Sequence, residues 1–479
     1  MTFKVERSNK MADNLNKIKK FVLRKFTIDK LKLNEDKNQL IAAGEGKAHE
    51  IPVANITEFK PGNRDVVKMI NSEEDKMIPE LIPLRHKRMM KNTFSFFRGT
   101  AGVMSYDLLH ERQSQIPVMI CGDAHVNNFG FFASPERQLL FGLNDFDETR
   151  VGNWEVDLKR LLVSAQLSGE LNGYKEKNIK KILKGTVAAY RAGIKYSNSL
   201  KVMNRFYLSY NIDDLLDLVS NDDKQMKKLL KKIAKKAPKN NSNKVVKKFT
   251  SKGKDGKTIF TENPPRARRI PDKLYADFIK AIPQYLHSVS QDVQVLLSNF
   301  RVSDIIRYSV GVGSFGTRCY LVLLTAKDNS HLVLQIKEAL PSRFDLTTMT
   351  RMDAQKQAPE EGKRIITGQR ILQTFSDPFL GSMNVDGRNF YVRQFRDMKD
   401  SVKVNKLDKN SFNAYTHMCA FILAVAHFQS PTAAMIYGYI AESKKFDKHF
   451  TDWATAYSKQ VHKDYATFKN YLKSGVDKN

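Results

Sequence analysis

The hydrophobic positions of this chain change their spacing several times, and each change marks an expected element. In the first half, PVMICGD is a short apolar run that ends at Asp123, and RQLLFGLNDFDE gives another strand after the turn signal SPE. From Trp154 to about Leu218 the apolar residues recur at helical spacing, as in VDLKRLLVSAQLSG. The pattern predicts short strands followed by a helical segment.

The second half combines strands and helices in another order. After Pro264 we expect a helix, then the neighbouring strands CYLVLL and HLVLQIK, joined by the turn AKDNS. GKRIITGQRILQTFS predicts a helix, NFYVRQFRDMK a strand, and AYTHMCAFILAVAHF a C-terminal helix. No internal repeat is visible. The whole pattern predicts an α+β protein of two lobes.

These elements predict four parts of the chain. They are a basic N-terminal extension (1–54), a helical lobe with the first strands (55–300), a small lobe (301–400), and C-terminal helices that complete the helical lobe (401–479). A lysine-rich insertion (224–257) interrupts the helical lobe.

Composition narrows the class of protein. Hydrophobic residues make up 41% and charged residues 27% of the 479 residues, as in ordinary globular proteins. No apolar run approaches the roughly 20 residues of a membrane helix, and the N-terminus lacks a secretory apolar core, so we expect a cytoplasmic protein without a membrane span. The three cysteines (Cys121, Cys319, Cys419) are scattered in apolar contexts, which argues against disulfides and zinc.

The net charge of +29 is concentrated in the lysine-rich insertion. Leu229, Leu230 and Ile233 give its first half a helical face, whereas its second half is expected to be flexible. The simpler interpretation is a solvated insertion, and weak, non-specific binding of polyanions is the alternative. No helix-turn-helix, zinc or RNA-recognition signature accompanies the charge, so a nucleic-acid-binding protein is a less favoured hypothesis.

Oxygen-bearing side chains follow two of the predicted strands. Asp123 and Asn128 lie in GDAHVNNFG, and Asp145 lies in LNDFDE. Mg²⁺ takes few protein oxygens and completes its octahedron with phosphates and water. Phosphoryl transfer also needs a carboxylate that orients the attacking hydroxyl and accepts its proton. We therefore expect Asp123 as base, with Asn128 and Asp145 as metal ligands, although Asp and Asn also cap turns in many proteins.

The order GD-x-H-x-x-N, then a strand and DFD, resembles the catalytic and metal loops of aminoglycoside-phosphotransferase-like kinases. Cys121 stands where those loops usually have a histidine. The resemblance implies a structural role for His125 and assistance to the metal from Asp147. It also implies that Asp157, in WEVDLKRL, supports the metal loop from the following helix.

A glycine-rich segment, VGVGSFGTRCYLVLL, lies between two predicted strands. A dinucleotide-binding fingerprint would be followed by a helix, whereas a strand on each side is the kinase form, in which backbone N–H groups cover phosphates. A flexible hairpin is the alternative. The expected nucleotide-binding residues of this segment are Gly311, Gly313, Ser314 and Gly316.

Lys337 lies in the next strand, in LVLQIKEA, like the lysine of the kinase V-A-I-K motif. Its ammonium would contact the α- and β-phosphates of ATP, and its apolar neighbours argue against a simple surface lysine. A kinase lysine is normally fixed by a glutamate of the following helix, and Glu360 and Glu361 are the two candidates.

The glycine segment comes after the catalytic loop, which reverses the order of ordinary kinases. We therefore expect a circularly permuted kinase-like domain, because permutation is tolerated where chain ends lie close together. The helix FILAVAHFQS supports this hypothesis, since a similar helix leads into the catalytic loop of small-molecule kinases. A buried Ala-rich helix without this meaning is the alternative.

Together, NTFSFFRGTAGVMSYDL, GDAHVNNFG, LNDFDET, WEVDLKRL, VGVGSFGTRCY, GQRILQTFSDPFLG and YVRQFRDMK resemble the bacterial family called domain of unknown function 2252 (DUF2252). The likeness spans about residues 55 to 435. It departs at NTFSFFRG, where that family usually has Ser-Pro, and in the insertion. Arg98, in FFRG, is expected to bind phosphate or carboxylate, with a structural salt bridge as the alternative.

The leading hypothesis is ATP- and Mg²⁺-dependent phosphotransfer to an acceptor that the sequence does not identify. Helices of residues 160–300 are expected to form the acceptor pocket. Transfer of AMP on the same fold and a nucleotide-binding regulatory pseudokinase are the alternatives.

Overall fold

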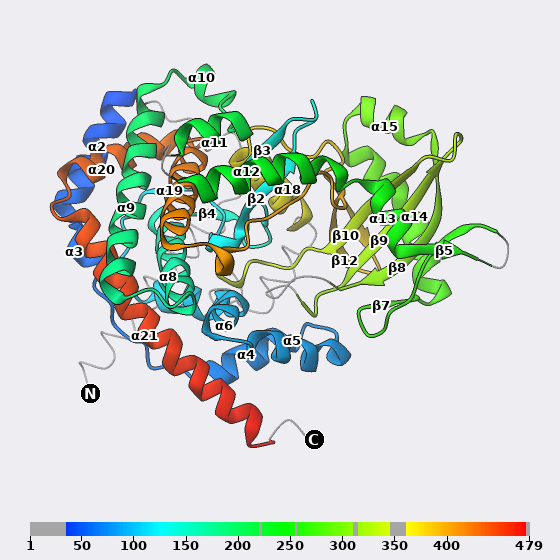
Figure 1. Ribbon diagram of the computed structural model, residues 1–479, viewed down its shortest axis with the longest axis horizontal. Helices are drawn as coiled ribbons and strands as arrows, with labels where there is room; N and C mark the ends of the chain where they lie inside the picture. Colours follow the sequence, from blue (N-terminus) through cyan, green and yellow to red (C-terminus); the bar gives the residue numbers. More distant parts are fainter. Residues whose placement is uncertain (1–34, 220–222, 254–255, 310–314, 345–360, 476–479) are drawn as a thin grey trace, which may run out of the picture.

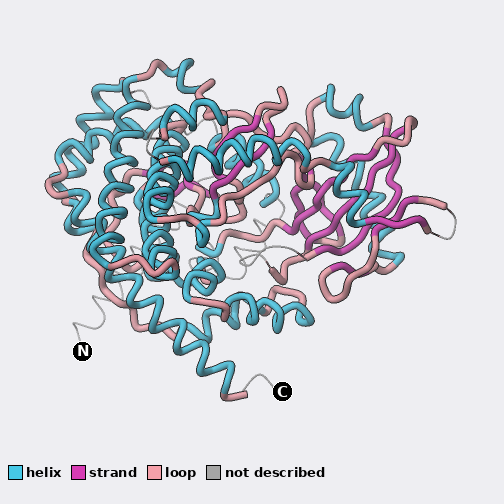
Figure 2. The backbone as a smooth tube through the Cα atoms, in the orientation of Figure 1, coloured by secondary structure: helices cyan, strands magenta, loops and turns pink. Residues whose placement is uncertain are grey.

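The computed structural model describes residues 35–219, 223–253, 256–309, 315–344 and 361–475 of the chain. The fold is mixed α+β, with most helices gathered on one side and a large sheet on the other (Figure 1). The Cα tube shows the same division, with the strands of the sheet side crossing one another in a twisted layer (Figure 2).

The helical lobe is built around α8 (Glu155–Leu171), which is buried on nearly all sides. It packs against α9 (Glu176–Ser199) and α21 (Phe446–Lys473), and α9 packs in turn against α19 (Lys409–His427) and α20 (Ala434–Glu442). The other helices of this lobe are α2 (Lys37–Glu50), α3 (Val53–Ile56), α4 (Val66–Glu74), α5 (Ile82–Met89), α6 (Thr93–Gly99), α7 (Ala101–Leu109), α10 (Val202–Phe206), α11 (Ile212–Leu218) and α12 (Lys224–Lys236).

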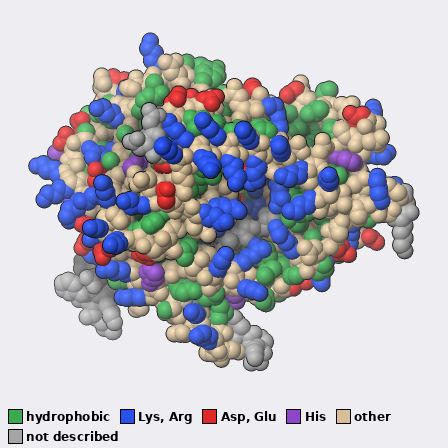
Figure 3. Space-filling model, viewed as in Figure 1, with side chains coloured by type: hydrophobic (Ala, Val, Ile, Leu, Met, Phe, Trp, Pro, Cys, Tyr) green, Lys and Arg blue, Asp and Glu red, His purple; other side chains and the backbone are tan. Residues whose placement is uncertain are grey.

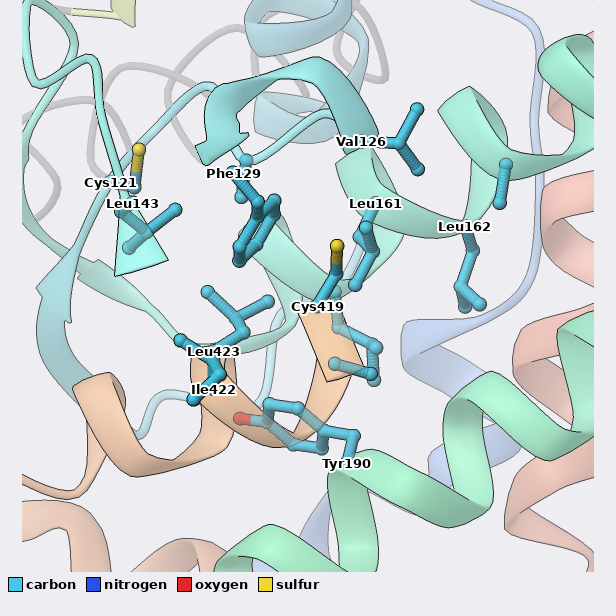
Figure 4. Close-up of a cluster of buried hydrophobic side chains, with 14 of the residues drawn as sticks. Cys121, Val126, Phe129, Leu143, Leu161, Leu162, Tyr190, Cys419, Ile422 and Leu423 are labelled. Atoms are coloured by element: carbon cyan, nitrogen blue, oxygen red, sulfur yellow. The ribbon is translucent and has the colours of Figure 1, made fainter. Parts of the chain in front are cut away.

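Two short ladders within this lobe position the acidic loops. β1 (Pro117–Ile120) pairs with β4 (Arg150–Asn153), and β2 (Phe129–Ala133) pairs with β3 (Leu139–Leu143), both antiparallel. The GDAHVNN loop therefore lies between β1 and β2, and the NDFDE turn lies between β3 and β4, so that both leave the same pair of ladders. Buried side chains from these strands, α8 and α19 form the core beneath them (Figure 4).

The second lobe contains a six-stranded antiparallel sheet in the order β11-β12-β10-β9-β8-β7. Lys337 lies on the central strand β10, opposite Cys319 of β9 and Tyr391 of β12. The strands are β7 (Ala267–Arg268), β8 (Phe300–Tyr308), β9 (Cys319–Ala326), β10 (His331–Glu338), β11 (Gly381–Val385) and β12 (Arg388–Gln394). Helix α18 (Glu361–Leu372) follows β10 in the chain and packs against β11 and β12.

One face of this sheet is covered by α14 (Asp272–Ser288) and α15 (Gln291–Leu297), whose apolar residues form a core with Tyr320, Ile336 and Phe390. The sequence placed these helices in the helical lobe, with a boundary at residue 300. In the structure, α14 contacts β11 and its buried residues share a core with the sheet. Helices of residues 272–297 therefore belong to the sheet lobe.

The lysine-rich insertion is ordered over more of its length than its composition suggested. Its second half was expected to be flexible, but it forms α13 (Ser242–Phe249) and β5 (Thr250–Lys252). Strand β5 pairs with β6 (Thr258–Phe260), which begins directly after the insertion. Val245 and Phe260 are buried with Leu321 and Val333 of the sheet. Valines and phenylalanines at helical and strand spacing form this apolar face, which the high lysine content made difficult to recognise in the sequence.

The segment after β12 connects the lobes. Its Asp400 forms an antiparallel bridge with Phe131 of β2, and the carbonyl of Asn240, in the insertion, accepts a hydrogen bond from the Met398 N–H at 2.7 Å. The insertion therefore touches this connection directly.

Among the described residues, no single helix is long and apolar enough to cross a membrane. In the described ranges, one bent pair, formed by Lys409–His427 and Pro431–Glu442, reaches that length and composition when the two helices are taken together.

The close contact of α2 with α20 makes a stability prediction. A Cβ at Gly44 would lie 2.0 Å from the Met435 carbonyl oxygen, whereas a Cβ at Gly46, on the same helix, meets nothing within 4 Å. We expect Gly44→Ala to lower the free energy of unfolding by about 1–3 kcal/mol. Gly46→Ala should instead raise it by about 0.5–1 kcal/mol, because alanine favours the helix. Urea unfolding followed by circular dichroism measures both, and equal effects would contradict this packing.

Candidate active site

Asp123 projects from a loop that is held by a buried carboxylate. Both oxygens of Asp157 accept backbone N–H groups, from Cys121 at 2.7 Å and from Gly122 at 2.8 Å, and Oδ2 lies 3.2 Å from Nε2 of His427. Gly122 has a φ of +78°, and a Cβ there would lie 2.2 Å from a backbone oxygen. The sequence predicted a supporting role for Asp157, and these contacts describe that support.

Asp123 itself is fixed by an arginine that the sequence did not point to. Nε of Arg160 donates to Oδ1 of Asp123 at 2.8 Å, and the guanidinium stacks over the ring of Phe97, 3.8 Å from its centroid. Oδ2 lies 3.8 Å from Nε2 of His125, and 18% of the Asp123 side chain is exposed. One oxygen is therefore anchored, while the other remains accessible beside the imidazole.

Asn128 joins the two acidic loops. Its Nδ2 donates to the carbonyl oxygens of Asp123 and Asp145, each at 2.9 Å, and its Oδ1 accepts from the Asn144 N–H at 3.3 Å. The sequence predicted Asn128 as a metal ligand, but in the structure its amide holds backbone atoms. The thiol of Cys121 donates to the Asp145 carbonyl at 3.2 Å, and burial raises the pKa of this thiol.

The acidic turn meets Lys337 across the two lobes. The ammonium of Lys337 forms a short ion pair with Oδ2 of Asp147, 190 residues away in the chain, and lies 3.7 Å from Oδ1 of Asp145. Burial lowers the pKa of Lys337, but the carboxylates of Asp145 and Asp147 outweigh burial and raise it above its ordinary value. A cation buried to this extent needs such partners.

One carboxylate oxygen of Asp145 lacks a hydrogen-bond donor. Oδ1 is buried and accepts no hydrogen bond from the described residues, although 49% of the whole side chain is exposed. Burial raises the pKa of this carboxyl, but Lys337 and two further cations outweigh it and hold the pKa at about 2. Asp145 is therefore ionised at neutral pH. Its Oδ1 has the Lys337 ammonium 3.7 Å away but accepts no hydrogen bond from the described residues, so this oxygen can bind a further cation.

Both carboxylate oxygens of Asp147 contact side chains of the protein. Besides the ion pair of Oδ2 with Lys337, its Oδ1 accepts the hydroxyl of Tyr391 at 2.8 Å. The sequence predicted that Asp147 assists a metal, whereas the structure shows it as the partner of the lysine. Within the described part of the chain, no group of three or more His, Cys, Asp or Glu side chains is arranged to hold a metal ion.

Glu361 does not pair with Lys337 in the structure. Its carboxylate forms a short ion pair with Arg364, one turn along α18. Arg364 in turn donates to the carbonyls of Asp147 and Leu340, each at 2.9 Å. Helix α18 thus contacts the acidic turn through an arginine, and Asp147 takes the lysine-fixing position that the sequence gave to a glutamate.

Most of the glycine segment lies outside the described residues, as does Glu360. The members that fall there are Gly311, Gly313 and Ser314. Gly316 is described, with a φ of +114°, and its carbonyl accepts the Ile78 N–H at 2.8 Å. The neighbouring Phe315 is buried beneath the guanidinium of Arg88, 3.8 Å from the ring centroid. This end of the segment is therefore anchored to the helical lobe.

Two arginines near the acidic loops lack carboxylate partners. Nε of Arg98 makes only a 3.4 Å contact with Nε2 of His125, and Nε of Arg393 donates to Oε1 of Gln335 at 2.8 Å. Neither forms an ion pair with a described residue. Burial lowers the pKa of His125 to about 4, so this imidazole is neutral and can accept from Arg98. The structure does not show the salt bridge that was the alternative for Arg98.

A cavity of about 240 Å³ opens beside these groups, between β2, α18 and the inter-lobe connection. Its wall includes Asn144, the residue before Asp145, and Gln335, two residues before Lys337 on the same face of β10. The full lining is Phe132, Ala133, Asn144, Gln335, Gln369, Gln373, Asp377, Pro378, Arg393, Gln394, Phe395, Arg396, Asp397 and Lys399.

Sequence reasoning missed Arg160, Tyr391, Arg393 and Lys399. The last three fall within or beside one predicted strand, YVRQFRDMK. The alternation of strand residues, which puts Tyr391 and Arg393 on the same face, was the signal that could have pointed to them. Arg160 lies one turn after Asp157 on α8 and points toward Asp123. The direction of its side chain follows from the geometry of the helix and not from a sequence motif.

Comparison with known proteins gives one match. A family model described as "Uncharacterized protein conserved in bacteria (DUF2252)" matches residues 77–471. No curated protein and no solved structure matches the chain. The matched range contains both ladders, the six-stranded sheet and every site residue discussed above.

The contact between the lobes can be measured by a double-mutant cycle. We expect Lys337→Met and Asp147→Asn to show a coupling energy of about 1–3 kcal/mol in urea unfolding, because each leaves a buried or half-buried charge without its partner. The exposed pair Lys448 and Asp452 on α21 is a matched control, 2.6 Å apart, with an expected coupling of about 0.3–0.5 kcal/mol. A coupling at Lys337 no larger than the control would show that the ion pair does not join the lobes.

Proposed function

We propose that this chain, which belongs to the DUF2252 family of proteins conserved in bacteria, is an ATP- and Mg²⁺-dependent phosphotransferase with a permuted kinase-like fold. The observation that carries the proposal is the meeting of Lys337 with Asp145 and Asp147. An ammonium for the phosphates and an acidic turn for their metal are the two parts that every kinase site brings together.

The element order of the sheet lobe supports the proposal. The glycine segment joins β8 to β9, Lys337 lies on the next strand, and in the described part of the chain α18 follows before β11 and β12. In protein kinases the glycine-rich loop, the lysine strand and the αC helix follow in this order. Antiparallel pairing of β8, β9 and β10 matches the hairpins that this arrangement needs.

The proposed permutation has support in the contacts of α19. Its last residue, His427, lies against Asp157, and Ser430 just beyond it accepts the Met119 N–H of β1 at 2.8 Å. The end of α19 is therefore beside the start of the catalytic strand, about 310 residues away in the chain. In an unpermuted kinase these two segments would be joined directly.

Magnesium fits the residues present. Asp145 would hold it through its buried oxygen, and Asn128 would contribute if its amide oxygen turned from Asn144 toward the metal. Asp147 becomes available to the same site when phosphates take over its contact with Lys337. The bound ion supplies positive charge that neutralises the phosphate oxygens during transfer. Two carboxylates are a sufficient protein contribution for Mg²⁺ when a substrate gives the remaining oxygens.

The cations near this site suit a triphosphate. Lys337 would bind the α- and β-phosphates from one side. The guanidinium groups of Arg98 and Arg393, which form no ion pair with a described residue, would approach from the two lobes. Planar guanidinium groups bind phosphate oxygens in pairs, which fixes direction as well as charge. The cavity lined by Gln335 and Asn144 would take the nucleoside end.

In the proposed reaction Asp123 acts as the base. The acceptor's O–H loses its proton to Oδ2 of Asp123, while its oxygen forms a bond to the γ-phosphorus of ATP. The bond between that phosphorus and the β,γ-bridging oxygen breaks, and ADP leaves with the electron pair. Arg160 keeps Asp123 in position through Oδ1, so the carboxylate loses little freedom when the acceptor binds.

Replacement of the base tests the proposal. We expect Asp123→Asn to lower kcat by about 10²–10⁴-fold, because the amide accepts no proton, while affinity for ATP with Mg²⁺ changes little. The measurement is release of ADP, with AMP and pyrophosphate followed in parallel, across a panel of metabolite and protein acceptors. Asp452→Asn, an exposed change on α21, should leave turnover as in the wild type.

Three outcomes separate the alternatives. Release of AMP and pyrophosphate, with AMP on the acceptor, would replace phosphoryl transfer by nucleotidyl transfer. Tight ATP binding without any turnover in the wild type would make the chain a nucleotide-binding pseudokinase. Equal turnover by the wild type and Asp123→Asn would remove Asp123 from the chemistry.

A further inference from the structure

We infer that the outer face of α12 and the 3-10 turn after it (Ala237–Lys239) is a sequence-independent binding site for the phosphate backbone of a nucleic-acid duplex. We name this face the lysine ladder. It consists of Lys224, Lys227, Lys228, Lys231, Lys232, Lys235, Lys236 and Lys239. Figure 3 shows Lys and Arg side chains gathered in a row across the middle of the face on which α12 lies.

The ladder is a concentrated and largely uncompensated charge. Residues 224–257 hold 14 lysines and one aspartate, a net charge of +13 out of the +29 of the whole chain. Six ladder lysines are exposed and have no ion pair with a described residue: Lys224, Lys228, Lys231, Lys232, Lys235 and Lys239. Lys236 pairs with Asp400 at 3.0 Å, beside the inter-lobe connection. The neighbouring acidic residues of α11 (Asp213, Asp214, Asp217) form no ion pair with the ladder.

The spacing of the lysines brings like charges together along α12. They recur at three- and four-residue steps, as in Lys224, Lys228, Lys232 and Lys236, so each turn places one ammonium next to another. Like charges at this spacing destabilise a helix. A solvated helix has no need of this repetition, whereas a bound polyanion turns each repulsion into an attraction.

The residue types on the two faces of α12 indicate which kind of polyanion can bind there. All its buried apolar residues (Met226, Leu230, Ile233) point into the protein, so none is left to enter a lipid bilayer. The ladder also contains no aromatic residue on which unpaired bases would stack. A site that offers cations, but no apolar residue for a bilayer and no aromatic residue for unpaired bases, can bind only a row of phosphates.

The dimensions agree with a duplex. The rise of 1.5 Å per residue gives the span from Lys224 to Lys239 a length of about 22 Å. The two strands of a DNA duplex together carry a phosphate about every 1.7 Å along its axis, which gives about 13 phosphates over this length. About half of them, roughly six, lie on the side that faces the ladder, which equals the number of ladder lysines without an ion pair to a described residue. The site is separate from the proposed active site, and its test does not depend on catalysis.

The test is binding of a fluorescent 20-base-pair DNA duplex to the full-length protein, followed by anisotropy as a function of salt. We expect a Kd of about 1–100 µM at 0.1 M salt and a slope of log K against log salt near −5, for about six contacts. The quadruple variant Lys228→Gln, Lys231→Gln, Lys232→Gln and Lys235→Gln should flatten the slope by about 3 to 4 and weaken binding by about 100-fold or more. Glutamine is chosen because it favours helix, and circular dichroism checks that α12 is retained.

The control variant removes the same charge from another helix. Lys177, Lys180, Lys181 and Lys184 are exposed on α9, and their change to Gln should leave the slope within about one unit of the wild type. Equal losses in the two variants would assign the binding to net charge and overturn the site. Absence of duplex binding at 0.1 M salt, tighter binding to anionic vesicles than to the duplex, or more than a tenfold preference between two unrelated duplexes would each overturn it as well.

Discussion

The contact of Lys337 with Asp145 and Asp147 is the interaction on which the arrangement of the two lobes depends. The lysine is almost completely buried at the centre of the sheet, so its charge must be met by carboxylates, and the only ones described in contact with it come from the other lobe. The β10 strand is thereby fixed against the acidic turn. In the proposed enzyme, phosphates of a nucleotide would take part of this contact, and Asp147 would then be released toward the metal.

A second set of contacts keeps the acidic loops rigid. Asp157 accepts two backbone N–H groups of the Asp123 loop, Asn128 holds the carbonyls of both loops, and Cys121 donates to the second. These groups are buried and satisfied, so the loops they define have little freedom. A carboxylate held in this way reaches a substrate without reorganisation, which is the general advantage of a preorganised site. Oδ1 of Asp145 differs from these groups, because it is buried and accepts no hydrogen bond from the described residues, and the ammonium of Lys337 lies 3.7 Å away.

The positive charge of the molecule is divided between two kinds of side chain with different tasks. Near the acidic loops it is carried mainly by arginines, half-buried and directed by single hydrogen bonds, as geometry-specific phosphate contacts require. On α12 it is carried by lysines at helical repeat, exposed and without fixed geometry. Lysines of this kind give affinity that falls steeply with salt and no selectivity. The two regions are connected through Asn240 and Lys236, which bind the segment between the lobes.

The sequence by itself determined the elements and the residue types of the site. Period-two and helical apolar patterns located β1, β3, β9, β10, α8, α18 and α19, and the DFD turn and LQIK strand indicated which charged groups to examine. Tertiary structure decided what these groups contact. It gave Lys337 the partner Asp147 instead of Glu361, placed Arg160 on Asp123, moved α14 and α15 to the sheet, and packed the second half of the insertion. The physical reason is that periodicity is a property of neighbouring residues, whereas a buried charge selects its partner among all groups that the fold brings within a few ångströms, and most of those are far away in the chain.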